Sequence, residues 1–472
     1  MRNDDDYFND EEFREILDDY EEAVKSGQPL FMDADDLADI ADYYQINGLY
    51  EEARQAIDSA AEKNPHSLGV LNYLIHEALQ DGRVDKAQEL LDSIMEQESP
   101  EYIYDKAEIL IACDKVEEAD LYLREKLNDT PPDEYQDYVL DVANLYTDYG
   151  LNDKAMEWMM RARQENTEDF KELMARTLFG LGKYDDSERI FNELIDQDPF
   201  QKRYWHALAS AQYMKEDYNA SISSSEYAIA IDPEDPEGIV AKANALFRLE
   251  NYEEALKYYE RYTQLAPDDE FGLLHQGTCL INLGRYDEAL KRLHEAADIA
   301  PSDSDLLIDI YQELAFTYSE KHELELALHY IDLTDALDCD HDDMYVIRGH
   351  ILLGNDHLEE AEKMFRRALL QSNNDPHIML RILVSLYDNK YVEATYLMFR
   401  KLFSGVNEDW ADGYAYMALC CWDTGRTEEF LHYLEKACDK NPQEARLVLS
   451  GLFPEDVAPK DYYSYMIEKI KK

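Results

Sequence analysis

The sequence has few basic residues and no long apolar run. It holds 45 Lys and Arg against 104 Asp and Glu, which gives a formal net charge of −59. This charge would repel nucleic-acid phosphates and anionic membrane surfaces, so we expect neither nucleic acid nor membrane as a partner. No apolar run approaches the roughly 20 residues that a membrane span needs.

Cysteine is also scarce. The six cysteines form no Cys-x-x-Cys pair, and most lie within helical apolar patterns, which favours reduced thiols. The first residues show no basic leader followed by an apolar core, the pattern of a signal peptide. We therefore expect a cytoplasmic protein.

Motifs for catalysis or metal binding are absent as well. The sequence contains no His-Glu-x-x-His, Gly-x-Ser-x-Gly or Gly-x-x-x-x-Gly-Lys pattern. Residues 339–343 (Cys-Asp-His-Asp-Asp) gather metal-ligand types, but they fall in a turn where acidic helix starts are ordinary. We interpret this run as a solvated loop, and we expect no enzyme activity, no cofactor and no metal.

What the sequence does contain is a repeat of 34 residues. Prolines recur at this interval at Pro199, Pro233, Pro267 and Pro301. Small residues recur with the repeat from Ala53 through Ala255 and Ala289 to Ala361 and Ala394. A fixed period of this length is typical of stacked helical hairpins, because one hairpin cannot bury its apolar face alone.

Within one repeat, the apolar residues follow the spacing of two amphipathic helices. Ala243, Leu246 and Phe247 share one face of the first helix. A turn such as Gly284-Arg285-Tyr286 then separates the two helices, since glycine ends a helix in the left-handed conformation at little cost. Proline stops the second helix, because it has no amide hydrogen to donate.

These features together resemble the tetratricopeptide repeat family. The family's early aromatic residue is matched by Trp205, its leucine and small residue by Leu208 and Ala209, and its turn by Gly-x-Tyr. The resemblance implies an all-α right-handed superhelix of about twelve hairpins. It also implies that the first helix of each hairpin, helix A, lines a concave wall where the family usually binds peptides. Trp205 is the residue we expect to anchor the core.

Three parts are expected along the chain. Residues 1–32 form an acidic N-terminal capping helix, residues 33–442 form the repeat array, and residues 443–472 form C-terminal capping helices. Between Ala289 and Ala327 the spacing grows by four residues, which predicts an irregular extra helical turn near residues 302–321. Caps are expected because terminal repeats otherwise expose apolar surface.

Arginines interleaved with aromatic residues stand out on the predicted concave wall. The candidate peptide-binding residues are Arg176, Phe179, Arg203, His206, Tyr213, Asn244, Phe247, Arg248 and Phe271. Arginine forks bind carboxylates, and aromatic faces supply apolar contact area. Two interpretations stay open. The residues form a groove for an acidic side chain or chain terminus, or the arginines pair with neighbouring acidic helices while the aromatics pack between repeats.

The predicted function is a non-catalytic scaffold that binds a peptide or extended protein segment on the concave face. The alternative is an acidic, chaperone-like holder of a basic partner protein, attracted by the field of the net charge. For the charge itself we favour a role in solubility. The oligomeric state is left open by the sequence.

Overall fold

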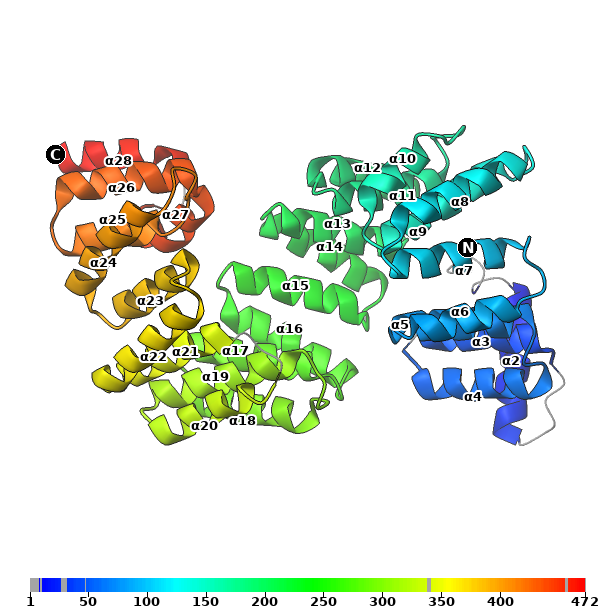
Figure 1. Cartoon of the computed structure of the whole chain (residues 1–472), viewed down its shortest axis with the longest axis horizontal. Helices are drawn as coiled ribbons and strands as arrows, with labels where there is room; N and C mark the ends of the chain where they lie inside the picture. The colour runs from blue at the N-terminus through cyan, green and yellow to red at the C-terminus, as the bar shows by residue number, and fades with distance from the viewer. Residues whose placement is uncertain are drawn as a thin grey trace. The chain divides into compact units, whose positions relative to one another are not determined.

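The computed structural model of the chain describes residues 8, 11–26, 32–46, 48–337, 341–454 and 457–471. Within these ranges it contains 27 α-helices, one short 3-10 helix and no strand (Figure 1). The all-α class is therefore confirmed. Contacts divide the chain into two compact units, Met1–Ile231 and Asp232–Lys472. None of the described helices is long and apolar enough to cross a membrane.

Each unit is a stack of six helical hairpins, in which helix A is followed by helix B. The first unit contains α3 (Ala34–Ile46) with α4 (Tyr50–Lys63), α5 (Leu68–Gln80) with α6 (Val84–Ser93), α7 (Pro100–Ala112) with α8 (Val116–Asp129), α9 (Tyr135–Asp148) with α10 (Asn152–Met159), α11 (Glu168–Gly180) with α12 (Tyr184–Gln197), and α13 (Lys202–Met214) with α14 (Tyr218–Ile231).

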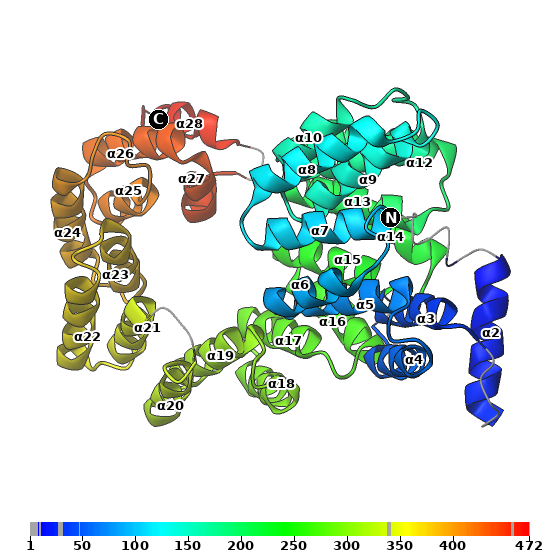
Figure 2. The same ribbon diagram turned by 45° about the vertical axis from the view of Figure 1, so that its right-hand side comes forward.

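The second unit contains α15 (Pro236–Arg248) with α16 (Tyr252–Leu265), α17 (Glu270–Asn282) with α18 (Tyr286–Ile299), α19 (Leu306–Glu320) with α20 (Leu324–Thr334), α21 (His341–Gly354) with α22 (Leu358–Gln371), α23 (Pro376–Asp388) with α24 (Val392–Gly405), and α25 (Tyr414–Asp423) with α26 (Thr427–Lys440). Several consecutive A helices contact one another, such as α3 with α5 and α21 with α23, and Figure 2 shows α21 and α23 in one row beside α22 and α24 in another. Twelve hairpins in the described residues agree with the number that the repeat predicts.

Every hairpin turn contains one residue in the left-handed backbone conformation. In six turns this residue is glycine, and in the other six it is Asp114, Glu216, Glu250, His322, Asp356 or Lys390. At Gly284 the turn closes with two bonds, from Gly284 N to Ile281 O at 2.9 Å and from Arg285 N to Leu280 O at 2.8 Å. Such a pair of bonds satisfies the last carbonyls of the A helix.

The small residues of the B helices lie where the helices cross. Ala53, Ala255 and Ala289 are at most 1% exposed, as their spacing predicts. In the eleventh hairpin the prediction of Ala394 is wrong by one residue, because Thr395 is fully buried and Ala394 is exposed. The Thr395 hydroxyl donates to the Tyr391 carbonyl at 2.9 Å, so this polar side chain is satisfied inside the core.

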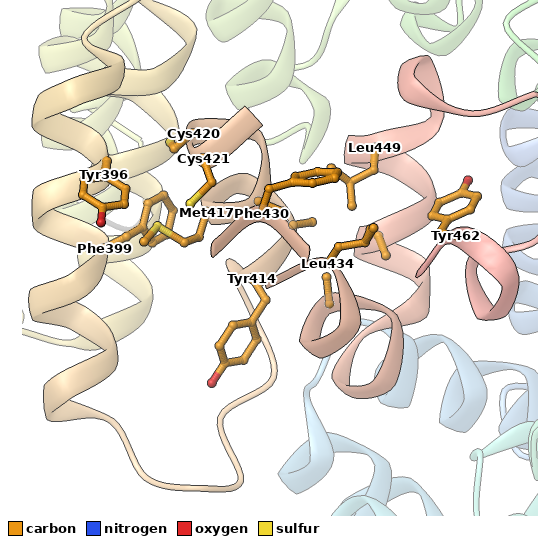
Figure 3. Packing of buried hydrophobic residues seen from close by; sticks show 14 of the residues in the cluster. Tyr396, Phe399, Tyr414, Met417, Cys420, Cys421, Phe430, Leu434, Leu449 and Tyr462 are labelled. Atoms are coloured by element: carbon orange, nitrogen blue, oxygen red, sulfur yellow. The ribbon is translucent and has the colours of Figure 1, made fainter. Parts of the chain in front are cut away.

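Additional helices cover the first and last hairpins. α2 (Glu11–Ser26) buries Phe13 and Tyr20 in a cluster with residues of α3. After the last hairpin follow α27 (Pro442–Leu449), the 3-10 helix Ser450–Leu452 and α28 (Pro459–Lys471), and α28 contacts both α26 and α27. Figure 3 shows how Phe430, Leu434, Leu449 and Tyr462 meet in this core.

The region of increased repeat spacing is α19 and the loop before it. α19 has 15 residues where α17 has 13, and six residues separate it from α18 where four separate α17 from α16. The four additional residues are thus shared between a longer helix and a longer loop.

Candidate functional site

The structure distributes the candidate peptide-binding residues over the two units. Residues of α11 and α13 belong to the first unit, and residues of α15 and α17 belong to the second. The first group is Arg176, Phe179, Arg203, His206 and Tyr213. The second group is Asn244, Phe247, Arg248 and Phe271.

In the first unit, Arg176 connects two consecutive A helices. From α11, its guanidinium donates to Asn144 Oδ1 at 2.9 Å and pairs with Asp148 Oδ1 at 2.7 Å, both on α9. The Arg176 and Asp148 side chains are 43% and 39% exposed. An ion pair at such a surface contributes about 0–1 kcal/mol. A partner's carboxylate could therefore replace Asp148 at little cost.

The Arg203 side chain is less exposed than that of Arg176, at 24% against 43%. Its Nη2 lies 3.2 Å from Glu172 Oε2 and donates to the Tyr204 hydroxyl at 3.2 Å. Tyr204 in turn donates to Glu168 Oε1 at 2.7 Å. Burial raises the pKa of Glu172, and the Arg203 charge opposes that rise. This network joins α11 to α13.

Three of the aromatic candidates pack inside their own hairpins. The rings of Phe179 and Tyr184, of Tyr213 and Tyr218, and of Phe247 and Tyr252 meet edge to face at 5.4, 5.3 and 5.3 Å between centroids. In each pair a ring near the end of helix A contacts the first residue of helix B. This geometry is favourable for aromatic rings, so these residues stabilise the turn.

The remaining candidates differ in exposure. His206 is only 7% exposed, whereas Arg248 is exposed. Asn244 Oδ1 accepts a hydrogen bond of 2.6 Å from the Tyr259 hydroxyl. Phe271 packs edge-on against His275, with 4.2 Å between ring centroids. Of these residues, Arg248 presents the most surface to a partner.

In the second unit, an open hollow of about 210 Å³ lies on three consecutive A helices, α15, α17 and α19. Its lining consists of Phe247, Leu274, His275, Thr278, Asp309, Gln312, Glu313 and Phe316. Among the candidate peptide-binding residues, Phe247 lines this hollow. The repeat spacing could have identified two more lining residues. Asp309 and Glu313 lie 38 residues after Phe271 and His275, which is the local repeat spacing, so they occupy the equivalent positions of the next helix A.

Burial sets the protonation of the groups in the hollow. It raises the pKa of Glu313 to about 7, and the neighbouring Asp309 charge adds to this rise. Burial also raises the pKa of Asp309 and lowers the pKa of His275 to about 4. Near neutral pH the hollow therefore presents a neutral imidazole, two carboxyl groups and two phenyl rings. It can accept an apolar side chain and a neighbouring cation.

The ligand-type run at residues 339–343 lies in part outside the described residues. Cys339 and Asp340 are not described, and nothing is said of the side chains of His341 and Asp342. Asp343 forms an ion pair with Arg381 on α23. Residues 341–343 begin α21, so the interpretation of the run as a loop is wrong for these three residues and stays a prediction for Cys339 and Asp340.

Two family models match parts of the chain. Residues 201–296 match the family described as anaphase-promoting complex, cyclosome, subunit 3, and residues 342–375 match a tetratricopeptide repeat. These matches confirm the resemblance, since they place repeats of the tetratricopeptide type in both parts of the chain. Such repeats are protein-interaction modules, so the chain has the architecture of an interaction scaffold. No curated protein matches the chain.

Several solved structures are similar to the chain. Yeast Tom70 is 15% identical, with 88% of this chain and 94% of that chain covered and a TM-score of 0.43. A tetratricopeptide repeat protein from Parabacteroides merdae is 16% identical, with 53% and 98% covered and a TM-score of 0.43. YrrB, described as a TPR protein with an unusual peptide-binding site, is 22% identical, with 40% and 93% covered and a TM-score of 0.32.

Proposed function

We propose that the chain is a non-catalytic scaffold that binds an extended segment of a partner protein along its A helices. The observation that carries this proposal is the hollow on α15, α17 and α19. It combines aromatic rings with hydrogen-bonding groups, which is the usual composition of a site that fixes both the position and the orientation of a ligand. Because three consecutive A helices contribute, a segment lying across them would contact all three hairpins.

The chemistry of the hollow favours a segment with an apolar side chain next to Lys or Arg. Phe247 and Phe316 supply apolar contact area. Asp309 and Glu313 are four residues apart on α19, so both carboxyls lie on the same face of the helix. A basic side chain would favour the charged form of Glu313 and form charge-assisted hydrogen bonds with both carboxylates.

The arginines of the first unit offer a separate contact for the partner protein. In this part of the proposal a carboxylate of the partner replaces Asp148 at Arg176 or Glu172 at Arg203. Arg248 extends the surface in the second unit. The residues proposed to contact the partner protein are the lining of the hollow and the candidates Arg176, Phe179, Arg203, His206, Tyr213, Asn244, Phe247, Arg248 and Phe271.

An acidic holder of a basic partner is the second candidate. It is favoured by the net charge of −59 and by exposed carboxyl groups on the A helices of the first unit, such as Asp137 and Asp148 on α9. Attraction by the field fades as the Debye length falls from about 8 Å at physiological salt to about 3 Å at 1 M. A segment seated in the hollow would largely survive that change.

Affinity capture from a native cell extract at 0.15 M and at 1 M salt separates these candidates. The baits are the wild type, Gln312→Arg in the hollow, an Arg203→Glu/Arg248→Glu double variant, and the matched control Gln264→Arg on the exposed face of α16. We expect a partner that persists at 1 M salt, is lost with Gln312→Arg and is kept with Gln264→Arg. Basic proteins that are lost at 1 M salt and retained by every variant at 0.15 M would contradict the scaffold and support the acidic holder.

A further inference from the structure

A histidine and two carboxylates meet on two consecutive A helices of the first unit. His76 lies on α5, and Asp105 and Glu108 lie on α7, which contacts α5. Asp105 and Glu108 are three residues apart and therefore share one face of α7. His76 Nε2 lies 3.3 Å from Asp105 Oδ1 and 3.4 Å from Glu108 Oε2. The three ligand atoms all lie within 4.8 Å of one another.

Asp105 is the buried centre of this cluster, and its hydrogen bonding is incomplete. Its side chain is 1% exposed, compared with 11% for Glu108 and 29% for His76. Asp105 Oδ1 accepts a hydrogen bond of 2.8 Å from Asn72 Nδ2, whereas the buried Oδ2 has no hydrogen-bond partner among the described residues. A buried carboxylate oxygen without a partner is costly, so it points to a group that the protein itself does not supply.

The distances from His76 Nε2 to the two carboxylates agree with a metal coordination sphere. Charge-assisted N–H···O bonds are about 2.7–2.9 Å long, which is shorter than either distance from His76 Nε2. Around a tetrahedral zinc ion with bonds of about 2.0–2.1 Å, neighbouring ligand atoms lie about 3.3–3.4 Å apart. The measured 3.3 and 3.4 Å agree with two edges of that tetrahedron.

We propose that His76, Asp105 and Glu108 bind one divalent transition-metal ion of the zinc type, with water as the fourth ligand. One imidazole nitrogen with carboxylate oxygens suits zinc and its neighbours, whereas Ca²⁺ and Mg²⁺ take oxygen ligands. Asn72 holds Asp105 as an outer-shell partner, a common arrangement around metal ligands. The exposed edge of His76 gives the ion a route to the site.

The position of the site gives the ion a structural role. Because its ligands come from α5 and α7, the ion would join the second hairpin to the third. Acidic groups on both flanking A helices, Asp42 on α3 and Asp148 on α9, act electrostatically on His76 and Glu108. Their negative field raises the local concentration of cations.

The test is metal binding by the full chain after removal of metals with EDTA. We expect one equivalent of Co²⁺ to give the visible absorption of a tetrahedral site, without the near-ultraviolet band of a thiolate ligand, and Zn²⁺ to displace it. The one-equivalent signal should be lost in His76→Gln and in Glu108→Gln. Asn72→Ala should weaken Zn²⁺ binding by about 10- to 100-fold.

His66→Gln is the matched control, because His66 is an exposed histidine of the same unit. It should bind as the wild type does. Circular dichroism without metal shows whether each variant is folded, and Glu108→Gln decides the question if His76→Gln does not fold. A thiolate band, or wild-type binding in a folded His76→Gln or Glu108→Gln chain, would overturn the proposal.

Discussion

Two tryptophans illustrate how single residues differ from what the repeat motif suggests. Trp158 is fully buried, and its indole nitrogen donates to Asp120 Oδ1 at 2.8 Å. Trp205, which the motif favours as the anchor, is only half-buried and stacks on Tyr227 with 4.4 Å between ring centroids. The adjacent Tyr204, 1% exposed, takes the buried position instead. Periodicity identifies the helix but leaves open which of two adjacent aromatics turns inward.

Trp158→Ala should therefore destabilise the protein more than Trp205→Ala. Removing a fully buried tryptophan costs about 3–5 kcal/mol, because it leaves a cavity and, here, also leaves the Asp120 carboxylate without its indole donor. Urea denaturation followed by circular dichroism measures both losses. A Trp205→Ala loss equal to or larger than that of Trp158→Ala would contradict this assignment of the core.

Glu313 should make stability depend on pH. Burial raises its pKa in the folded state from 4.5 to about 7. A group whose pKa is raised by folding contributes stability below its unfolded pKa, and that contribution is lost as the pH rises through the folded pKa. Wild-type stability should therefore fall between about pH 4.5 and 7 by about 1–3 kcal/mol relative to Glu313→Gln. Urea denaturation of both proteins at pH 5.5 and at pH 8 tests this, and a difference that does not change with pH would contradict it.

At the level of elements, the hairpin is defined by close contacts between helix A and helix B. Gly277 on α17 faces Leu293 on α18, and a Cβ at Gly277 would lie 2.6 Å from Leu293 Cδ2. Gly405, at the end of α24, has no atom within 4 Å of such a Cβ. Both glycines are helical, so packing and not backbone conformation distinguishes them.

Gly277→Ala should destabilise the protein by about 1–3 kcal/mol, because the crowded methyl outweighs the higher helix propensity of alanine. The matched substitution Gly405→Ala should be neutral or should stabilise by up to about 1 kcal/mol. Thermal unfolding of the two variants compares them directly. Equal changes in stability in the two variants would contradict this prediction, because they would show that Leu293 can move away from the added methyl group without loss of stability.

The repeat predicts the elements better than it predicts individual positions. Because prolines, turn tyrosines and small residues share one register, the pattern finds the hairpins and their turns. The pattern fails in the eleventh hairpin, where it assigns the buried small position to Ala394 although Thr395 occupies it. A threonine fills the small position there by bonding to its own helix. Residue identity alone does not reveal such a bond.

For the whole molecule, the fold class and the twelve hairpins follow from the sequence, whereas the sites do not. The hollow and the cluster of His76, Asp105 and Glu108 combine side chains from different hairpins, so their distances depend on packing. Among 104 acidic residues, spacing alone does not distinguish these carboxyls from solvated ones. Similarly, the acidic partners of Arg176 and Arg203 come from neighbouring A helices, and only the structure shows which ones.

The net charge of −59 should make the whole protein more stable as salt is added. Ion pairs at exposed surfaces contribute little, so repulsion among the excess carboxylates dominates the electrostatic free energy. Raising NaCl from about 0.05 M to 0.5 M shortens the Debye length and screens that repulsion. We expect the midpoint of thermal unfolding to rise. A fall would show that attractive ion pairs outweigh the repulsion.

Peptide selection tests the proposed binding along the A helices most directly. A displayed library of extended peptides is selected on the full chain at 1 M salt, and the recovered peptides are titrated against wild type, Gln312→Arg and Gln264→Arg. We predict peptides that pair an apolar side chain with Lys or Arg, bind Gln264→Arg as they bind wild type, and lose at least about tenfold in affinity for Gln312→Arg, which is about 1.4 kcal/mol. Peptides that bind Gln312→Arg as tightly as wild type would contradict the hollow on α15, α17 and α19 as the binding site.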